Sequence, residues 1–195
     1  MDGVTLADVV STLGLAVALA ACAGLRAWLP LLMAGGLARA GMLDLGESFR
    51  FLSSNKALAL FAVATVLEIL GDKVPAVDHA LDALSTVLRP AAGAVLAAAV
   101  FGRIVNPLQA VALGLAVGAP TALVPHAGKV ALRGISTTFT AGLANPLLSL
   151  VEDAATIVLF ALAVVVPVAV AVFLALVGIL LLRRSRARHR VTAAA

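Results

Sequence analysis

The chain has 195 residues, of which 63% are hydrophobic and 12% are charged, and its mean hydropathy is +1.13. A soluble domain is about 45–50% apolar and about 25% charged, and a chain of this size has no core large enough to bury the excess in water. Composition therefore excludes soluble globular, disordered and fibrous proteins and indicates an integral membrane protein. Despite the net charge of +4, the absence of tyrosine and the single tryptophan argue against a base-stacking nucleic-acid surface. The single cysteine, Cys22, excludes disulfide frameworks and multi-cysteine metal sites.

Five apolar runs predict an all-α polytopic bundle with about five spans: residues 9–38, 57–70, 90–105, 107–124 and 154–182. As one straight helix the first run would be about 45 Å long, against about 30 Å for the hydrocarbon core. We therefore expect a break near Arg26 and Pro30, and six spans if the break divides the run in two. The third and fourth runs are short and rich in alanine and glycine, which favours closely packed helices. Gly114 and Gly118 have the small-xxx-small spacing of such a contact.

Two stretches are more polar than a plain span. Residues 77–88 form an amphipathic pattern, and residues 126–145 mix charged and hydroxyl side chains with apolar ones. Both are predicted to lie in the interface or to re-enter the bilayer against protein. We expect the longer segments 72–89 and 126–153 to fold over or into the same end of the bundle. Arg89 and Pro90 are interpreted as the end of one segment and the start of the next.

The distribution of basic residues predicts the orientation. With five spans and an external N-terminus, nine lysines and arginines fall on the cytoplasmic side and four on the other side. Asp2 and Asp8, with no basic residue before Arg26, suit a translocated N-terminus. We expect a multi-pass protein of the inner or plasma membrane with a cytoplasmic C-terminus. Residues 1–182 would form one transmembrane domain, and residues 183–195 a basic tail that contacts anionic lipid.

Leu19-Ala20-Ala21-Cys22 has the form of a lipoprotein cleavage site. The preceding residues contain no lysine or arginine, contrary to a secretory signal. We expect instead that Cys22 is a small thiol buried in the first helix.

Charged residues interrupt the apolar runs in nearly equal numbers. Six acids and five bases do so: Glu68, Asp72, Asp78, Asp82, Glu152 and Asp153 against Arg26, Lys73, Arg89, Lys129 and Arg133. An ionised residue at the centre of a membrane helix costs about 2.5–3.5 kcal/mol, so such residues face protein or water and pair with one another. The functional interpretation is a hydrated vestibule or ion pathway, and the structural one is a set of static ion pairs. Two local alternatives also apply, because Glu152 and Asp153 complement a helix dipole and Asn145-Pro146 is typical of a helix start.

Metal and enzymatic interpretations rest on fewer residues. Asp78, His79 and Asp82 offer ligands on adjacent turns, although interfacial polar residues have the same pattern. Ser149 with Glu152 and Asp153, or His126 with a remote acid, would suit hydrolysis. No nucleophile elbow, HExxH motif or phosphate-binding glycine loop accompanies them. We expect no cofactor.

The order of these residues resembles a family of small membrane proteins known as domain of unknown function 4126. The resemblance covers residues 24 to about 167. It rests on these anchors: Gly24-Leu25-Arg26-Ala27-Trp28-Leu29-Pro30, then Glu68-x3-Asp72-Lys73-x-Pro75-x2-Asp78-x3-Asp82, then Arg89-Pro90, then His126-x2-Lys129-x3-Arg133, and Asn145-Pro146-x2-Ser149-x2-Glu152-Asp153. The resemblance implies an integral membrane protein without an assigned activity, and it favours a functional site over static pairs. The candidate binding or transport residues are Arg26, Glu68, Asp72, Lys73, Asp78, Asp82, Arg89, His126, Lys129, Arg133, Asn145, Ser149, Glu152 and Asp153.

The leading hypothesis is transport or conduction of a small solute or ion. Glu68 and Asp72 would bind the cation or proton, with Lys73, Lys129 and Arg133 as counter-charges and His126 as the group that titrates near neutral pH. Glu68 lies one helical turn inside Asp72, so we expect it to be the more desolvated acid, and we expect Lys129 or Arg133 to pair with an acid of the set. The alternatives are a lipid-facing enzyme or scramblase and a non-catalytic partner subunit. A homo-oligomer is compatible with each of them.

Overall fold

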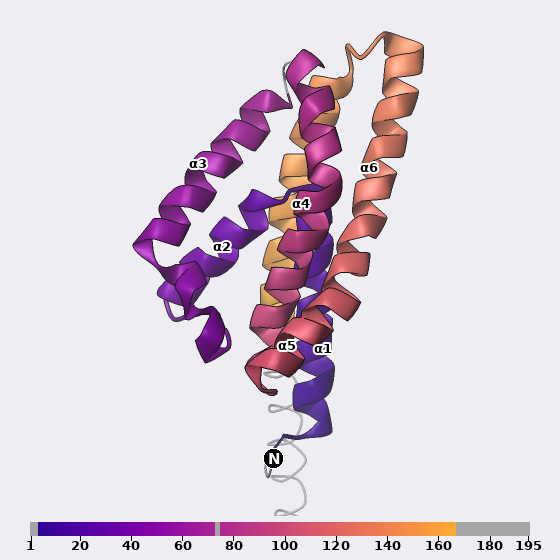
Figure 1. The fold of residues 1–195 in the computed structure, drawn as a ribbon. Helices are drawn as coiled ribbons and strands as arrows, with labels where there is room; N and C mark the ends of the chain where they lie inside the picture. The colour runs from indigo at the N-terminus through magenta and orange to yellow at the C-terminus, as the bar shows by residue number, and fades with distance from the viewer. Residues whose placement is uncertain (1–3, 73–74, 167–195) are drawn as a thin grey trace, which may run out of the picture. The chain divides into compact units, whose positions relative to one another are not determined.

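The computed structural model describes residues 4–72 and 75–166, with side chains from residue 84 onward in the second range. The described residues form helices and no strand, which confirms the all-α fold. In chain order these are α1(Leu6–Leu25), α2(Trp28–Arg39), the 3₁₀ helix η1(Glu47–Ser53), α3(Asn55–Gly71), α4(Pro75–Phe101), α5(Pro107–Leu113), the π-helical segment η2(Gly114–Gly118), α6(Ala119–Thr140) and a last helix, Asn145–Val166 (Figure 1). Two compact units divide the chain, residues 1–163 and 164–195, and the features discussed below belong to the first.

Four helical stretches of the described chain are long and apolar enough to cross a membrane: Leu6–Leu25, Leu84–Phe101, Pro107–Thr140 and Asn145–Val166. The count rises to five if η1 and α3, which meet at a bend of 57°, form one broken span. The polytopic helical bundle is therefore confirmed, with four or five candidate spans.

The predicted break in the first apolar run is confirmed at Arg26. Its backbone is extended, with φ −138° and ψ 126°, so α1 ends at Leu25 and α2 starts at Trp28. At 1.5 Å per residue the twelve residues of α2 span about 18 Å, which is too short to cross the hydrocarbon core. The first run thus contains one full span followed by a half-length helix.

Three predicted boundaries are wrong. The helix α4 continues through Arg89 and Pro90, and α5, η2 and α6 form one helical stretch beyond residue 124. The last helix starts at Asn145 rather than at residue 154. The physical reason is the same in each case: charged residues lower the local hydropathy, but here they lie on buried helix faces and do not end the helix.

The helix α4 is the centre of the bundle, because 61% of the window Leu84–Phe101 is buried against 39% or less for the other candidate spans. Small residues allow its close contact with η2. A Cβ built on Gly114 would lie 2.4 Å from the Ala94 carbonyl oxygen, and one on Gly118 would lie 2.4 Å from the Gly93 carbonyl oxygen. The predicted close contact at Gly114 and Gly118 is therefore confirmed.

The contact between α1 and α6 is equally tight. A Cβ on Gly24 would lie 2.2 Å from the carbonyl oxygen of Ala122. Cys22, two residues before Gly24 on α1, is buried as expected. This close packing brings the end of α1 against α6, and it positions the charged residues described next.

Candidate functional site

Eight charged side chains from five parts of the fold meet inside the bundle. We call this set the charged cluster. Among the described side chains it contains four acids and four bases, and the formal charges of these eight cancel: Glu68, Asp72, Glu152 and Asp153 with Arg26, Arg89, Lys129 and Arg133. The most exposed of these side chains, that of Asp153, is 17% exposed, and the four bases are at most 4% exposed.

Asp72 is the centre of the charged cluster. It follows the last residue of α3, and its Oδ2 accepts hydrogen bonds from Lys129 Nζ (3.2 Å), Arg133 Nη2 (2.9 Å) and Arg26 Nη1. Burial raises the pKa of the Asp72 carboxyl, but Lys129, Arg26 and Arg133 together lower it by more, so this pKa lies below its ordinary value. The carboxyl is therefore a carboxylate at neutral pH and holds three cations from two other parts of the fold.

Arg26 connects the break between α1 and α2 to the last helix. Its Nη2 donates to Ser149 Oγ (2.8 Å) and to the Ser149 carbonyl (3.3 Å), and its Nε lies 2.6 Å from Asp153 Oδ1. The guanidinium is fully buried. Because an arginine with no carboxylate partner would be very unfavourable here, Asp72 and Asp153 are what allow Arg26 to interrupt an apolar run.

Lys129 and Arg133 lie one turn apart on α6 and share two acids. Besides Asp72, Lys129 Nζ lies 3.0 Å from Glu152 Oε2, and Arg133 Nη2 lies 3.2 Å from the same oxygen. Opposite charges thus alternate across three helices. This confirms the predicted pairing of Lys129 or Arg133 with an acid of the set.

Glu68 and Arg89 each contact one of the two helix ends that meet at the break between α1 and α2. The Glu68 carboxylate accepts hydrogen bonds from the backbone N–H groups of Ala27 (3.1 Å) and Trp28 (3.3 Å), at the start of α2. Arg89 Nη1 donates to the carbonyl of Gly24 (3.1 Å), near the end of α1. A helix carries partial positive charge at its N-terminus and partial negative charge at its C-terminus, so each side chain complements the end that it contacts. The two side chains also form an ion pair, with Arg89 Nη2 3.6 Å from Glu68 Oε1.

His126 lies against Arg89. Its Nδ1 is 3.3 Å from Arg89 Nη1, and its Nε2 is 3.4 Å from Thr86 Oγ1. Arginine always donates, so Nδ1 accepts and the ring proton is assigned to Nε2.

A family model described as "Domain of unknown function (DUF4126)" matches residues 13–187. The chain belongs to this family. All eight residues of the charged cluster fall inside the matched part of this DUF4126 protein. No curated protein and no solved structure matches it.

The structure corrects one prediction about the two acids of α3 in this DUF4126 protein. Glu68 is 6% exposed and Asp72 is 2% exposed, so Asp72 and not Glu68 is the more desolvated. The reason is that Lys129 and Arg133 of α6 lie against Asp72, whereas Glu68 lines a cavity. The main partners of Asp72 include Lys129 and Arg133, as expected, but the cation beside Glu68 is Arg89.

Other candidate residues are outside the cluster or outside the described side chains. The side chains of Lys73, Asp78 and Asp82 are outside the described part of the structure. The predicted metal site, which combined the two aspartates with His79, is also outside it. Asn145 is buried, but its Oδ1 makes no hydrogen bond within the described residues, so the capping bond expected at this helix start is absent there. The described residues contain no group of three or more potential metal ligands.

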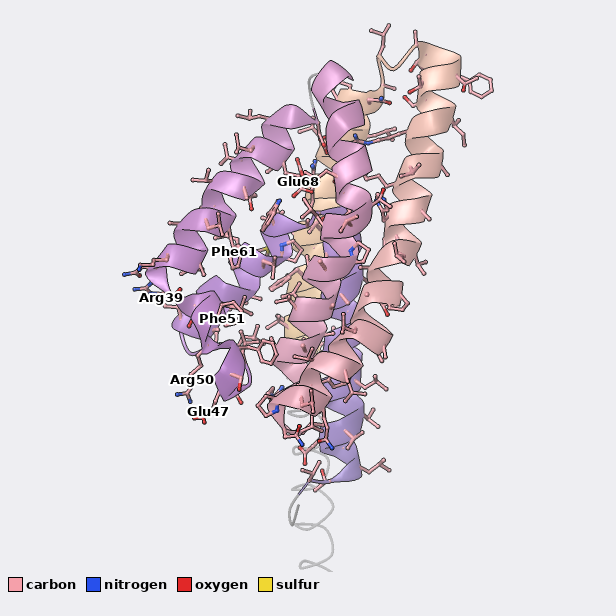
Figure 2. All side chains as sticks on the ribbon, viewed as in Figure 1. Arg39, Glu47, Arg50, Phe51, Phe61 and Glu68 are labelled. Atoms are coloured by element: carbon pink, nitrogen blue, oxygen red, sulfur yellow. The ribbon has the colours of Figure 1, made fainter. Side chains whose placement is uncertain are left out.

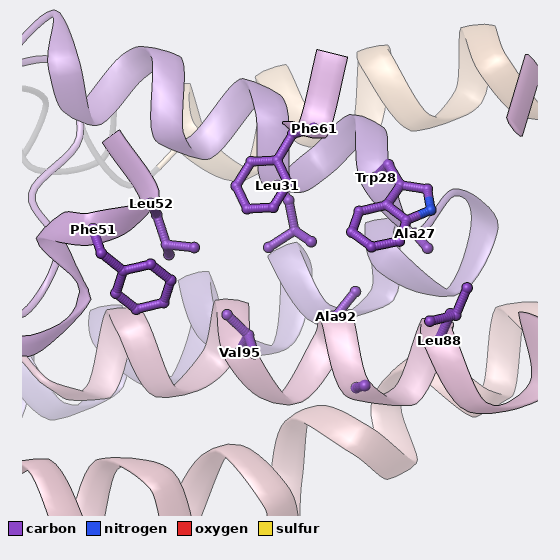
Figure 3. A pocket seen from close by; sticks show the side chains of 10 residues that line it. Ala27, Trp28, Leu31, Phe51, Leu52, Phe61, Leu88, Ala92 and Val95 are labelled. Carbon is purple, nitrogen blue, oxygen red and sulfur yellow. The ribbon is translucent and has the colours of Figure 1, made fainter. Parts of the chain in front are cut away.

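Two neighbouring cavities flank Trp28. The first, about 240 Å³, is lined by Glu68 and Ser85 together with apolar residues of α2, α3 and α4. The second, about 230 Å³, is wholly apolar and lies between α2, η1, α3 and α4 (Figure 3). Trp28, Ala27 and Leu88 line both. Sequence reasoning missed this pair of cavities, although the chain's only tryptophan, two residues after Arg26, was a signal for it.

Proposed function

We propose that this DUF4126 protein transports or conducts a small solute or ion across a cell membrane, and that the exchange takes place at the ion pair Glu68–Arg89. The observation that carries the proposal is the interrupted helix at Arg26 with its two ends against charged side chains. Non-helical backbone at membrane depth is tolerated where protein buries it or where it lines a cavity. In secondary transporters, discontinuous helices of this kind form the substrate and ion sites.

The charged cluster divides into a tightly connected part and a more open part. The ion pairs around Asp72, Glu152 and Asp153 have separations of 3.2 Å or less. These pairs share members, because at least one residue of each pair is also bonded to a second residue of opposite charge. This part holds α3, α6 and the last helix together. It is the frame of the proposed site.

The more open part is the pair Glu68–Arg89. Its separation of 3.6 Å is the largest in the cluster, and within the described part of the chain Glu68 has one cationic partner where Asp72 has three. Glu68 also lines the first cavity. Figure 2 shows it on α3, at the side that faces α4. A proton or cation that reaches Glu68 would replace the weakest ion pair of the cluster and leave the frame intact. For this reason Glu68, rather than the more buried Asp72, is the proposed exchange site.

We propose the inner or plasma membrane as the location, with a cytoplasmic C-terminus and contact between the arginine-rich tail and anionic lipid. The support is the excess of lysine and arginine on one side of the spans. Self-association into a homo-oligomer belongs to the same proposal, since small residues line several helix faces.

The test is a flux measurement on purified protein in liposomes. Gradient-driven flux of H⁺, Na⁺, K⁺ and choline is compared between the unmodified protein, Glu68→Gln and Glu47→Gln. Glu47 is the matched control because it is exposed and its ion pair is with exposed Arg50.

We expect flux of at least one of the four cations above protein-free liposomes, a loss of tenfold or more in Glu68→Gln, and no change in Glu47→Gln. Each rate is normalised to the amount of protein that elutes as a folded species. Absence of flux for all four cations, or full flux in folded Glu68→Gln, would overturn the proposal.

A further inference from the structure

The cavity pair beside Glu68 has an unusual combination of walls for a site inside a membrane bundle. Of the described residues that line the first cavity, one is an acid, Glu68, and the others are apolar or aromatic except Ser85. The second cavity continues past the Trp28 ring to Phe61, whose ring centroid lies 6.2 Å from that of Trp28 (Figure 3). The described walls of the two cavities thus combine one carboxylate with three aromatic rings, those of Trp28, Phe51 and Phe61, and with aliphatic side chains.

Among the described residues that line the two cavities, none is basic. Arg89, whose Nη2 lies 3.6 Å from Glu68 Oε1, is not one of these lining residues. The charged side chain in the described walls is therefore an acid. An anion would meet Glu68 there and no cationic side chain.

Bare metal cations do not suit these walls either. Their hydration shell has to be replaced by several oxygen ligands, and the described side chains of the first cavity provide one carboxylate and one hydroxyl. A cation that is itself hydrophobic has no such requirement. Its charge is balanced by the carboxylate, and its apolar groups contact the Trp28 and Phe61 rings, which attract cations through their π faces.

We propose that the cavity pair binds a small hydrophobic organic cation, such as an aryl or alkyl quaternary ammonium compound. The positive nitrogen lies beside Glu68 and the apolar group lies against Trp28, toward the second cavity. Volumes of about 230–240 Å³ for each cavity are below the usual 300–1,000 Å³ of ligand sites, so the ligand has about one ring and one ammonium group. As a substrate class this inference rests on the proposed transport function.

Trp28 makes binding directly measurable, because it is the only tryptophan of the chain. Tryptophan fluorescence of the detergent-solubilised protein is titrated with phenyltrimethylammonium. The matched neutral probe is tert-butylbenzene, in which carbon replaces the positive nitrogen, and the matched anion is benzenesulfonate. We expect a saturable change with the cation, and at least tenfold weaker binding of the other two.

Two variants test the site independently of each other. Glu68→Gln removes the charge and should weaken binding of the cation at least tenfold, whereas Glu47→Gln should bind as the unmodified protein does. Ala64→Leu fills the first cavity and leaves Glu68 in place. It should abolish binding without any change of charge, so the inference does not depend on the folding of Glu68→Gln alone.

The proposal is overturned if the cation causes no saturable change, if tert-butylbenzene binds as tightly as the cation, or if folded Glu68→Gln and Ala64→Leu bind normally. Flux separates this result from the fate of the proposed function. Flux of H⁺, Na⁺, K⁺ or choline without binding of phenyltrimethylammonium would overturn the ligand class alone. Binding without flux of any tested cation, phenyltrimethylammonium included, would overturn transport and leave a binding site.

Discussion

Replacing Asp72 with asparagine tests whether the charged cluster is electrostatically balanced. The substitution keeps the size of the side chain and removes one of four negative charges, so the cluster becomes positive by one. Breaking a buried ion pair typically costs about 3–5 kcal/mol, because a charge is left without compensation. Arg26 keeps Asp153, and both Lys129 and Arg133 keep Glu152, so we expect a loss at the lower end, about 3 kcal/mol.

The assay is thermal unfolding in detergent. For a chain of this length about 1 kcal/mol corresponds to roughly 2–4 °C, so Tm should fall by about 6–12 °C in Asp72→Asn. Adding Lys129→Gln restores equal numbers of acids and bases. The double variant should therefore be more stable than the sum of the two single losses predicts. The proposed charge balance would be refuted if Asp72→Asn unfolded at the Tm of the unmodified protein. It would also be refuted if the losses of stability in the two single variants simply added in the double variant.

Three further predictions follow from the packing, the charges and the titration of the protein. Gly118→Leu should lower Tm or dissociate an oligomer, since even a Cβ at Gly118 would lie 2.4 Å from a carbonyl oxygen of α4. The control Gly14→Ala should be neutral or stabilising, because a Cβ at Gly14 has no neighbouring atom within 4 Å. Equal Tm values for the two variants would contradict this packing. A reporter fused to the C-terminus should be active on the cytoplasmic side, and activity on the outer side alone would reverse the topology. Because the pKa of Asp72 lies below its ordinary value of 3.8, its contribution to stability is complete above that value and is lost as pH falls through the lowered pKa. Tm should therefore drop below about pH 4 in the unmodified protein and less steeply in Asp72→Asn, and parallel curves would contradict this assignment.

The fold class and the ion pairing are predictable from the sequence for one physical reason. Charges inside apolar runs must find partners, and the near-equal numbers of acids and bases predict that they find each other. The same reasoning gives the break at Arg26, because a 30-residue apolar run exceeds the thickness of the hydrocarbon core. These inferences need only the hydrophobic thickness and the cost of an unpaired charge.

The helix ends and the relative burial of Glu68 and Asp72 are not predictable in this way. Hydropathy falls where charges occur, whether or not the helix continues, so α6 extends to Thr140 past a predicted end at residue 124. Burial of Asp72 depends on α6, which is distant in sequence. The cavities likewise require the positions of three helices relative to Trp28, and no local pattern encodes them.

The most direct test of the central claim, that a solute reaches Glu68 inside the bundle, is the accessibility of a cysteine in the cavity wall. In a Cys22→Ala chain, Ser85→Cys places a thiol in the first cavity, and Leu96→Cys places one at a fully buried position of the same helix. We expect Ser85→Cys to react with a cationic methanethiosulfonate reagent faster than with an anionic one, because Glu68 shares the cavity, and Leu96→Cys to react with neither. Equal resistance of both thiols to both reagents would show that no solute reaches Glu68 and that the charged cluster is a set of static ion pairs.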